Sequence, residues 1–111
     1  MEHKISTEIF QKAEKYIPGG VNSPVRAFKS VNRKAPIFAC KGKGARIWDE
    51  DGNEYIDYIC SWGPLILGHN PENVIKGVRE AIEMGSSFGL PTKMEVELAE
   101  LIIKCCPSIE K

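Results

Sequence analysis

Hydrophobic side chains near the N-terminus recur at the spacing of an amphipathic helix. The apolar positions are three and four residues apart and so fall on one helical face: Ile9, Phe10, Ala13, Tyr16 and Ile17. Ser6 or Thr7 is placed to cap this helix, and Pro18-Gly19-Gly20 ends it, because proline and glycine both disfavour a continuing helix. A single helix of this length is marginal in water, so we expect it to dock on another part of the protein.

The pattern then changes to the one expected of strands. Apolar residues, many of them β-branched or aromatic, are frequent over residues 37–40, 45–49 and 55–59, which predicts three short strands. We expect a turn at residues 41–44 between the first two strands. Asp51-Gly52 predicts a hairpin turn between the last two, because glycine readily adopts the positive φ that such turns need. The segment is therefore predicted to be a small antiparallel meander.

Helical spacing returns from Asn70 onward. Asn70 is a suitable cap and Pro71 suits a first helical position, where its missing N–H costs nothing. Gly85 can end this helix in left-handed geometry. One face would carry the apolar side chains of Val74, Ile75, Val78, Ala81 and Ile82.

A further helix is predicted to begin at Thr92. Thr92 and Glu95 have the spacing of a capping box, and Pro107 would end the helix. Its apolar stripe consists of Met94, Leu98, Leu101, Ile102 and Cys105. Two apolar stripes without parallel strands beside them would leave larger exposed patches than a monomer usually carries.

These elements predict an α+β arrangement in two parts. Residues 1–65 would hold the N-terminal helix, the following loop and the meander, and residues 66–111 would begin a helical layer. The change of pattern between Gly63 and Gly68 is the best candidate for the boundary.

Composition and charge exclude several function classes. The chain has 15 basic and 15 acidic residues, so it lacks the positive charge that nucleic-acid binding requires. No apolar run approaches the roughly 20 residues of a membrane span. The N-terminus is charged, unlike a secretory leader, which favours a cytoplasmic protein. The four cysteines lack metal-site or redox spacing and are expected to be reduced thiols.

Two motifs imitate ligand sites without completing them. Asp49-x-Asp51-x-Asn53 resembles the start of a calcium loop, but Glu54 stands where glycine is needed and Cys60 where a bidentate glutamate belongs. Gly42-x-Gly44 lies between two predicted strands and opens no helix, so it is not a dinucleotide fingerprint. No metal site is expected.

The strongest chemical candidate is Arg26. It lies within Pro18-Gly19-Gly20-Val21-Asn22-Ser23-Pro24-Val25-Arg26-Ala27-Phe28, where glycines and prolines exclude a long helix and restrict the backbone. A guanidinium held in a defined place can grip a carboxylate or phosphate with two hydrogen bonds. The alternative is an ordinary solvated loop arginine.

Four segments carry a family resemblance. Residues 18–28, with Ser61-Trp62-Gly63-Pro64, Leu67-Gly68-His69 and Ser87-Phe88-Gly89-Leu90-Pro91-Thr92, resemble the glutamate-1-semialdehyde 2,1-aminomutase family. That family belongs to the class III, fold type I pyridoxal-phosphate aminotransferases. The resemblance covers this whole chain but only about the first quarter of such an enzyme. The resemblance therefore implies an α/β fold for the enzyme, in which the final helices here would begin the large cofactor domain and its parallel sheet would come later.

The resemblance implies an activity and a set of site residues. The enzyme would be an isomerase that converts glutamate 1-semialdehyde to 5-aminolevulinate, the tetrapyrrole precursor, with pyridoxal phosphate or pyridoxamine phosphate as cofactor. Arg26 would hold the substrate carboxylate, Ser23 would add a hydroxyl donor, and Trp62 would wall the pocket. The family's Schiff-base lysine and phosphate-binding segment have no match here. We therefore expect no catalytic residue in this chain, no cofactor binding by it alone, and a homodimer for the whole enzyme.

Alternatives remain at several of these points. Trp62 could be an ordinary core tryptophan. For His69, we expect a hydrogen bond at the start of a helix and not acid–base catalysis. The family pattern is often Gly-His-x-His-Pro, whereas this chain reads Gly68-His69-Asn70-Pro71 and lacks the second histidine. Leu90 departs from the alanine usual in the family. For the whole protein, the rivals are another class III ω-amino acid aminotransferase and a non-catalytic binding or dimerisation piece.

Overall fold

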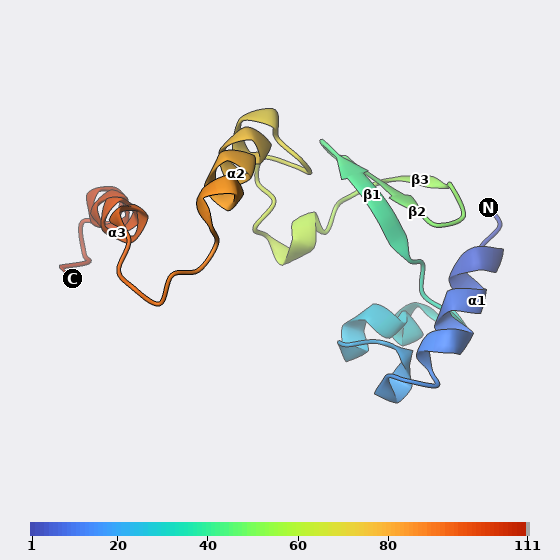
Figure 1. Ribbon diagram of the computed structural model, residues 1–111. Coiled ribbons are helices and arrows are strands. Elements are labelled where there is room, and N and C mark those ends of the chain that lie inside the picture. The colour runs from blue at the N-terminus through green and yellow to red at the C-terminus, as the bar shows by residue number, and fades with distance from the viewer. Residues whose placement is uncertain (111) are drawn as a thin grey trace. The chain divides into compact units, whose positions relative to one another are not determined.

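The computed structural model describes residues 1–110, which form two compact units, Met1–Ile75 and the part from Lys76 onward. Figure 1 labels the helices and strands. In chain order they are α1 (Lys4–Ala13), β1 (Ala39–Lys43), β2 (Arg46–Asp49), β3 (Glu54–Ile56), α2 (Glu72–Met84) and α3 (Lys93–Cys105), with short 3₁₀ turns between them. This confirms the predicted order of a helix, a small sheet and two further helices.

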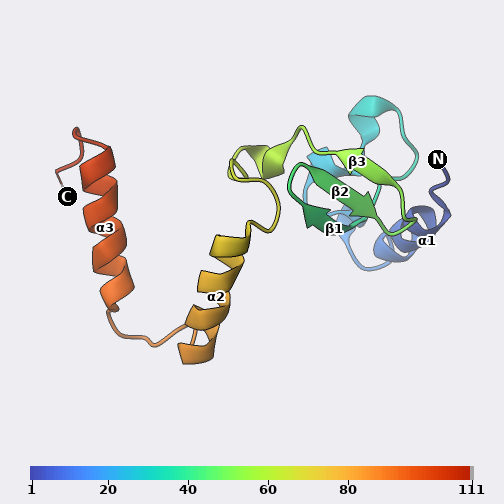
Figure 2. The same ribbon diagram turned by 90° about the horizontal axis from the view of Figure 1, so that it is seen from above.

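The sheet of the first unit is the predicted antiparallel meander. Its strand order is β1-β2-β3, and Ile47 pairs with Gly42 on one side and with Tyr55 on the other. Figure 2 shows the three strands side by side. Gly52 has a φ of +83°, as the predicted hairpin at Asp51-Gly52 requires.

The first turn of the meander differs from the prediction. Residues 41–43 belong to β1, and the chain reverses at Gly44-Ala45, where Gly44 has a φ of +56°. The sequence predicted a turn over the whole of Lys41-Gly42-Lys43-Gly44. Strand β1 lies at the edge of the sheet and is mostly exposed, so polar side chains are compatible with it.

Helix α1 begins and ends earlier than its pattern indicated. It starts at Lys4, and Ser6, predicted as a cap, is fully buried in its first turn. Asp51 acts as the cap from the hairpin. Its carboxylate accepts hydrogen bonds from the backbone N–H of Ile5 at 2.6 Å and of Ser6 at 2.9 Å, and from the Ser6 hydroxyl at 2.7 Å. Tyr16 lies beyond the end of the helix.

The core of the first unit is small and partly polar. The buried side chains among the described residues are Phe10, Ala27 and Pro36, which are apolar, and Ser6 and Asp49, which are polar. Phe10 packs so closely on Gly20 that a Cβ there would lie 2.5 Å from the Phe10 ring. The unit is therefore held together as much by hydrogen bonds as by apolar burial.

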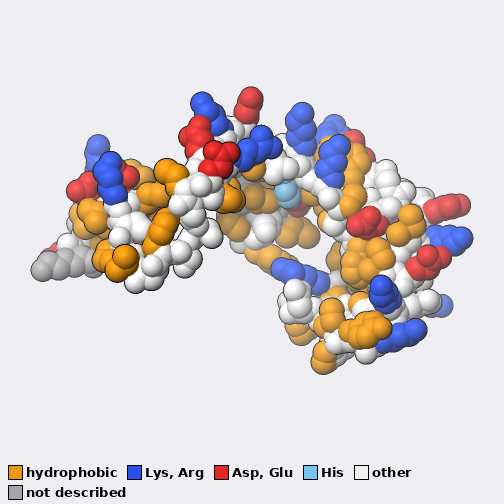
Figure 3. Space-filling model, viewed as in Figure 1, with side chains coloured by type: hydrophobic (Ala, Val, Ile, Leu, Met, Phe, Trp, Pro, Cys, Tyr) orange, Lys and Arg blue, Asp and Glu red, His pale blue; other side chains and the backbone are white. Residues whose placement is uncertain are grey.

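Helices α2 and α3 have the predicted type, and the end of α2 and both ends of α3 agree with the prediction. Gly85 follows α2 with a φ of +109°, and Thr92 forms the expected capping box with Glu95, whose side chain accepts the Thr92 N–H at 3.0 Å. Their apolar side chains are largely exposed, and Figure 3 shows hydrophobic side chains on the surface. Within residues 1–110, none of the helices is both long and apolar enough to span a membrane.

Candidate functional site

The segment that carries Arg26 is a short 3₁₀ turn that follows an extended residue and ends at a left-handed one. Ser23 is extended, Pro24–Ala27 form the turn, and the Arg26 N–H donates to the Ser23 carbonyl at 2.9 Å. Proline suits the first position of such a turn because its φ is already set. Phe28 then ends the turn in the left-handed region, with a φ of +58°. The backbone under the arginine is therefore fixed by local structure.

The guanidinium of Arg26 has one neighbour that orients it. Its Nη1 donates a hydrogen bond to the side-chain oxygen of Asn22 at 3.0 Å, one helical turn earlier in the chain. This contact uses one donor of the guanidinium fork. The remaining donors are available for a planar anion such as a carboxylate.

Arg26 and Asn22 lie at the wall of a cavity of about 490 Å³ in the first unit. The rest of the lining is apolar or backbone: Ala13, Ile17, Gly20, Val21, Phe28, Pro36, Ile37, Phe38, Ala39, Ile47 and Ile59. A mostly apolar pocket of this size with a few polar groups is typical of small-molecule sites. The arrangement suits a short carbon chain that carries a carboxylate at one end.

The structure separates the other two predicted site residues from this cavity. Neither Ser23 nor Trp62 is among the residues that line it. Ser23 is half-buried, and its carbonyl is used by the turn. The Trp62 side chain is 69% exposed and lies on a separate turn after β3. Of the three, Arg26 is brought to the cavity. The roles of Ser23 and Trp62 remain predictions.

The turn that carries Trp62 has an unusual backbone. Cys60, Ser61 and Trp62 are consecutive residues with φ values of +50°, +54° and +67°. None is glycine, so each side chain meets the steric penalty of the left-handed region. Asp57 supports the turn: its Oδ1 accepts the N–H of Ile59 at 2.8 Å and of Cys60 at 3.1 Å.

His69 forms a hydrogen bond with Asp57 and not with the start of α2. Its Nε2 lies 2.7 Å from Asp57 Oδ2, and its backbone pairs with Gly44 through two hydrogen bonds of 2.8 and 2.9 Å. The hydrogen bond from His69, followed by that from the Ile59 N–H, lowers the pKa of Asp57 below its ordinary value. The expected role of His69 in starting the helix was therefore wrong. Its partner is Asp57, a residue that the sequence motifs did not single out.

Asn70 also connects to the meander instead of capping α2. It has a φ of +52°, and its side-chain nitrogen donates to the Gly42 carbonyl at 2.8 Å. The left-handed backbone prevents it from taking the extended conformation of an N-cap. Aspartate often starts a turn in which its side chain accepts the backbone N–H two residues later, as Asp57 does with Ile59. That preference is the sequence signal that could have identified Asp57.

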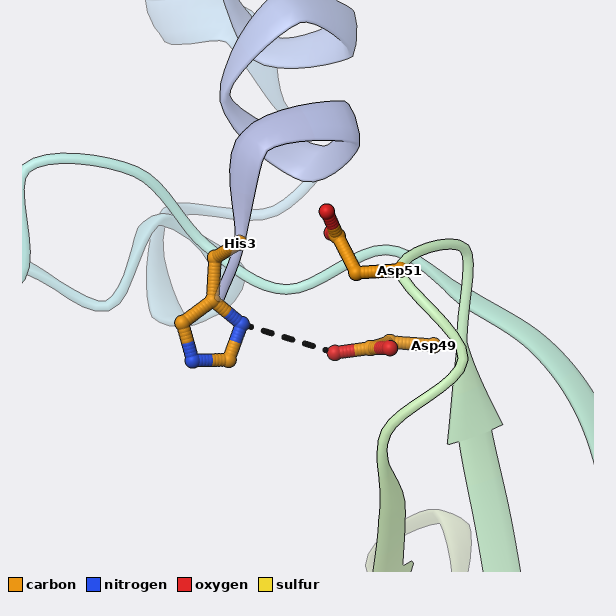
Figure 4. Close-up of side chains that lie close together, drawn as sticks. All are labelled: His3, Asp49 and Asp51. Carbon is orange, nitrogen blue, oxygen red and sulfur yellow. Dashed lines mark ion pairs between the residues drawn. The ribbon is translucent and has the colours of Figure 1, made fainter. Parts of the chain in front are cut away.

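A second cluster joins His3 to the carboxylates of Asp49 and Asp51 (Figure 4). His3 Nδ1 lies 3.5 Å from Asp49 Oδ2, while the Asp51 carboxylate points to the first turn of α1. Asp49 also accepts hydrogen bonds from the Asn53 N–H at 2.8 Å, the Asn53 side chain at 3.0 Å and the Tyr55 hydroxyl at 2.7 Å.

The electrostatics of this cluster follow from those hydrogen bonds. Burial by itself would raise the pKa of Asp49, but the hydrogen bonds from Asn53 and Tyr55 outweigh it, and the pKa lies below its ordinary value. Burial, together with the bond to Asp49, raises the pKa of Tyr55 to about 12. Both carboxylates already accept hydrogen bonds from protein donors. We therefore interpret the cluster as the contact that packs α1 against the hairpin.

The residues around Arg26 do not fit a covalently held pyridoxal cofactor. The cavity lining includes a guanidinium and an amide but no lysine that could form a Schiff base. It suits the carboxylate end of a substrate.

Comparison with known proteins places the chain in a family. Residues 28–111 match the family model described as aminotransferase class-III. The chain is 70% identical over 111 residues to a glutamate-1-semialdehyde 2,1-aminomutase of Fusobacterium nucleatum subsp. nucleatum, a match that covers all of this chain and 26% of the relative. The chain thus spans about a quarter of the length of that relative.

Solved structures agree with the fold. A transaminase with PLP bound superposes with a TM-score of 0.90 at 33% identity, over all of this chain and 25% of that one. A glutamate-1-semialdehyde aminomutase from Pseudomonas aeruginosa PAO1 gives 0.79 at 19% identity, over 92% of this chain and 22% of that one, which supports the fold alone. The fold is that of the first part of a fold type I transaminase. With the family model matching most of its length, the chain belongs to the class-III aminotransferase family.

Proposed function

We propose that these residues are the N-terminal part of a glutamate-1-semialdehyde 2,1-aminomutase, in which Arg26 holds the carboxylate of the substrate. The observation that carries the proposal is the position of Arg26, which is oriented by Asn22 at the wall of an apolar cavity. The 70% identity with a protein named for this activity supports the choice of substrate. The product would be 5-aminolevulinate, used for tetrapyrroles.

A fixed carboxylate has a particular value in an aminomutase. The substrate must present two adjacent carbons in turn to one reactive group, and a tether at its far end lets either carbon reach that group without release. The described residues would supply this tether and an apolar wall. Pyridoxamine phosphate would supply the chemistry of the amino-group exchange. We expect the part of the whole enzyme outside residues 1–111 to hold this cofactor. We also expect that whole enzyme to be a cytoplasmic homodimer.

The test is Arg26→Lys in a full-length polypeptide that contains residues 1–111. Where the gene supplies no remainder, the remainder of the Fusobacterium nucleatum relative can be joined to them. Lysine keeps the charge but loses the planar fork, and a charge-assisted hydrogen bond of this kind is worth about 1.5–3 kcal/mol. We expect kcat/KM for glutamate 1-semialdehyde to fall roughly ten- to 150-fold.

Arg46→Lys is the matched control. Arg46 is an exposed arginine paired with Glu54 on the sheet, and its replacement should leave kinetics unchanged. Wild-type kcat/KM in Arg26→Lys would contradict the proposal. So would an equal loss on an analogue that lacks the carboxylate.

The alternative is another class III aminotransferase, favoured by the 33% identity with the solved transaminase. It would require a separate keto acid as amino acceptor, whereas the mutase needs no second substrate. Turnover of glutamate 1-semialdehyde with and without an added keto acid separates the two. Strict dependence on the keto acid would support the alternative.

A further inference from the structure

The left-handed turn after β3 needs support that its own sequence does not supply. Three consecutive residues, Cys60 to Trp62, have positive φ, and a bulky residue such as tryptophan is rarely found there. Backbone strain of this kind persists where surrounding structure holds it, and it is concentrated at functional sites. The residues that stabilise the turn, and the cavity that it borders, therefore indicate its role.

Asp57 supplies the main contact at the start of the turn. Its Oδ1 accepts two successive N–H groups, those of Ile59 and Cys60. The turn is then closed by the Trp62 N–H, which donates to the Ile59 carbonyl at 2.9 Å. Removal of the Asp57 oxygen would leave the first two N–H groups without this acceptor, while the backbone strain would remain.

His69 prevents Asp57 from turning away. Its Nε2 binds the second carboxylate oxygen at 2.7 Å, and its backbone is paired with Gly44 at the end of the β1–β2 hairpin. The ring lies against Gly42, where a Cβ would be 2.5 Å from His69 Cγ. The glycine thus leaves room for the ring, and the sheet holds the ring against the carboxylate.

The turn touches the proposed substrate site at Ile59. Ile59 lines the cavity that Arg26 also lines, and its N–H is one of the two that Asp57 holds. Asp57 and His69 do not line the cavity themselves. They can affect a ligand there only through the turn, by placing Ile59 in the wall and fixing the backbone that carries Trp62.

We propose that Asp57, held by His69, is a positioning residue for the substrate site: it fixes the left-handed turn that carries Trp62 and places Ile59 in the wall of the Arg26 cavity. The part of this inference that concerns substrate rests on the proposed function. The part that concerns the turn stands on the hydrogen bonds and φ values alone.

The experiment uses the full-length polypeptide with Trp48→Phe, which leaves Trp62 as the single tryptophan of these residues. Any tryptophan in the remainder is likewise replaced by phenylalanine. Asp57→Ala removes the acceptor, and Asp57→Asn keeps an oxygen in its place. His69→Ala and His69→Gln form the second pair, since glutamine can still donate near the Nε2 position.

We expect both alanine variants to change the acrylamide quenching of Trp62 and to raise KM for glutamate 1-semialdehyde about tenfold, with kcat changed less than about threefold. The Asn and Gln variants should restore most of both properties. His3→Ala is the control, because it removes the other histidine–aspartate contact, which lies at the start of α1. It should alter neither readout.

Unchanged Trp62 quenching in both alanine variants overturns the proposal. Changed quenching with unchanged KM overturns its substrate part, as does a failure of the Asn and Gln variants to rescue. Where Asp57→Ala does not fold, His69→Ala is the deciding variant. It keeps the Asp57 carboxylate as an acceptor but removes the hydrogen bond that fixes its orientation. Failure of the proposed function is recognised separately, by wild-type kinetics in Arg26→Lys, while Trp62 quenching still decides the role of Asp57.

Discussion

Gly19 and Gly20 offer a controlled measurement of how tightly the Arg26 segment is packed on α1. Both residues have a φ of +72°. An added Cβ at Gly19 would meet no atom within 4 Å, whereas at Gly20 it would lie 2.5 Å from Phe10 Cε2 and 3.0 Å from Glu14 Cγ. Alanine at the two positions therefore shares the backbone penalty and differs in the contacts with Phe10, the closer of the two, and Glu14.

The expected magnitudes follow from these two terms. A left-handed backbone costs an alanine about 1–2 kcal/mol, and this applies at both positions. Overpacking a fitted contact adds about 1–3 kcal/mol, and this applies at Gly20 alone. We expect Gly19→Ala to lower the free energy of unfolding by about 1–2 kcal/mol and Gly20→Ala by about 2–5 kcal/mol.

The assay is urea unfolding of the 111-residue chain, followed by the fluorescence of Trp48 on β2 in a Trp62→Phe background. Comparable m-values in all variants would show that the same surface is exposed on unfolding. Adding Phe10→Ala to each glycine variant completes a double-mutant cycle. Removing the ring should bring the cost of Gly20→Ala close to that of Gly19→Ala, because the remaining contact is with the flexible Glu14 side chain.

Equal losses in the two single variants would refute the reasoning, because the contact with Phe10 would then contribute nothing. A Gly20→Ala cost that persists without the Phe10 ring would refute it as well. The result bears on function because Gly20 lines the same cavity as Arg26. A shifted Gly20 would move the segment that carries the arginine.

Three further predictions concern the same 111-residue chain. Its free energy of unfolding should be steady between pH 7 and 5 and should fall below about pH 4, because Asp49 and Asp57 have lowered pKa values and lose their stabilising contribution as they become protonated. Circular dichroism against pH checks this, and an Asp57→Asn variant with an equally steep fall would contradict the role of that residue. Incubation with pyridoxal phosphate, borohydride reduction and mass spectrometry should reveal no stoichiometric adduct at one lysine, and a single modified lysine would refute this. The exposed stripes of α2 and α3 should make the chain self-associate or bind a hydrophobic dye. A strictly monomeric chain without dye binding in light scattering would show otherwise.

The sequence by itself determined those features that depend on neighbouring residues. The spacing of apolar residues predicted the helices and strands, Asp51-Gly52 predicted its hairpin, and Thr92 with Glu95 predicted its capping box. In each case the residues that form the structure lie within a few positions of one another. Their backbone preferences and local hydrogen bonds therefore indicate the type of element before any tertiary contact is known.

The tertiary structure decided where partners come from distant parts of the chain. Asp51 caps α1 from 46 residues away, so the start of the helix could not be read from the residues around it. The same holds for His69, whose partner Asp57 lies across the loop after β3, and for Arg26, which shares a cavity with Ile59 while Trp62 does not line it. Pattern and propensity describe a segment, whereas a hydrogen bond or a cavity wall depends on which segments the folded chain brings together.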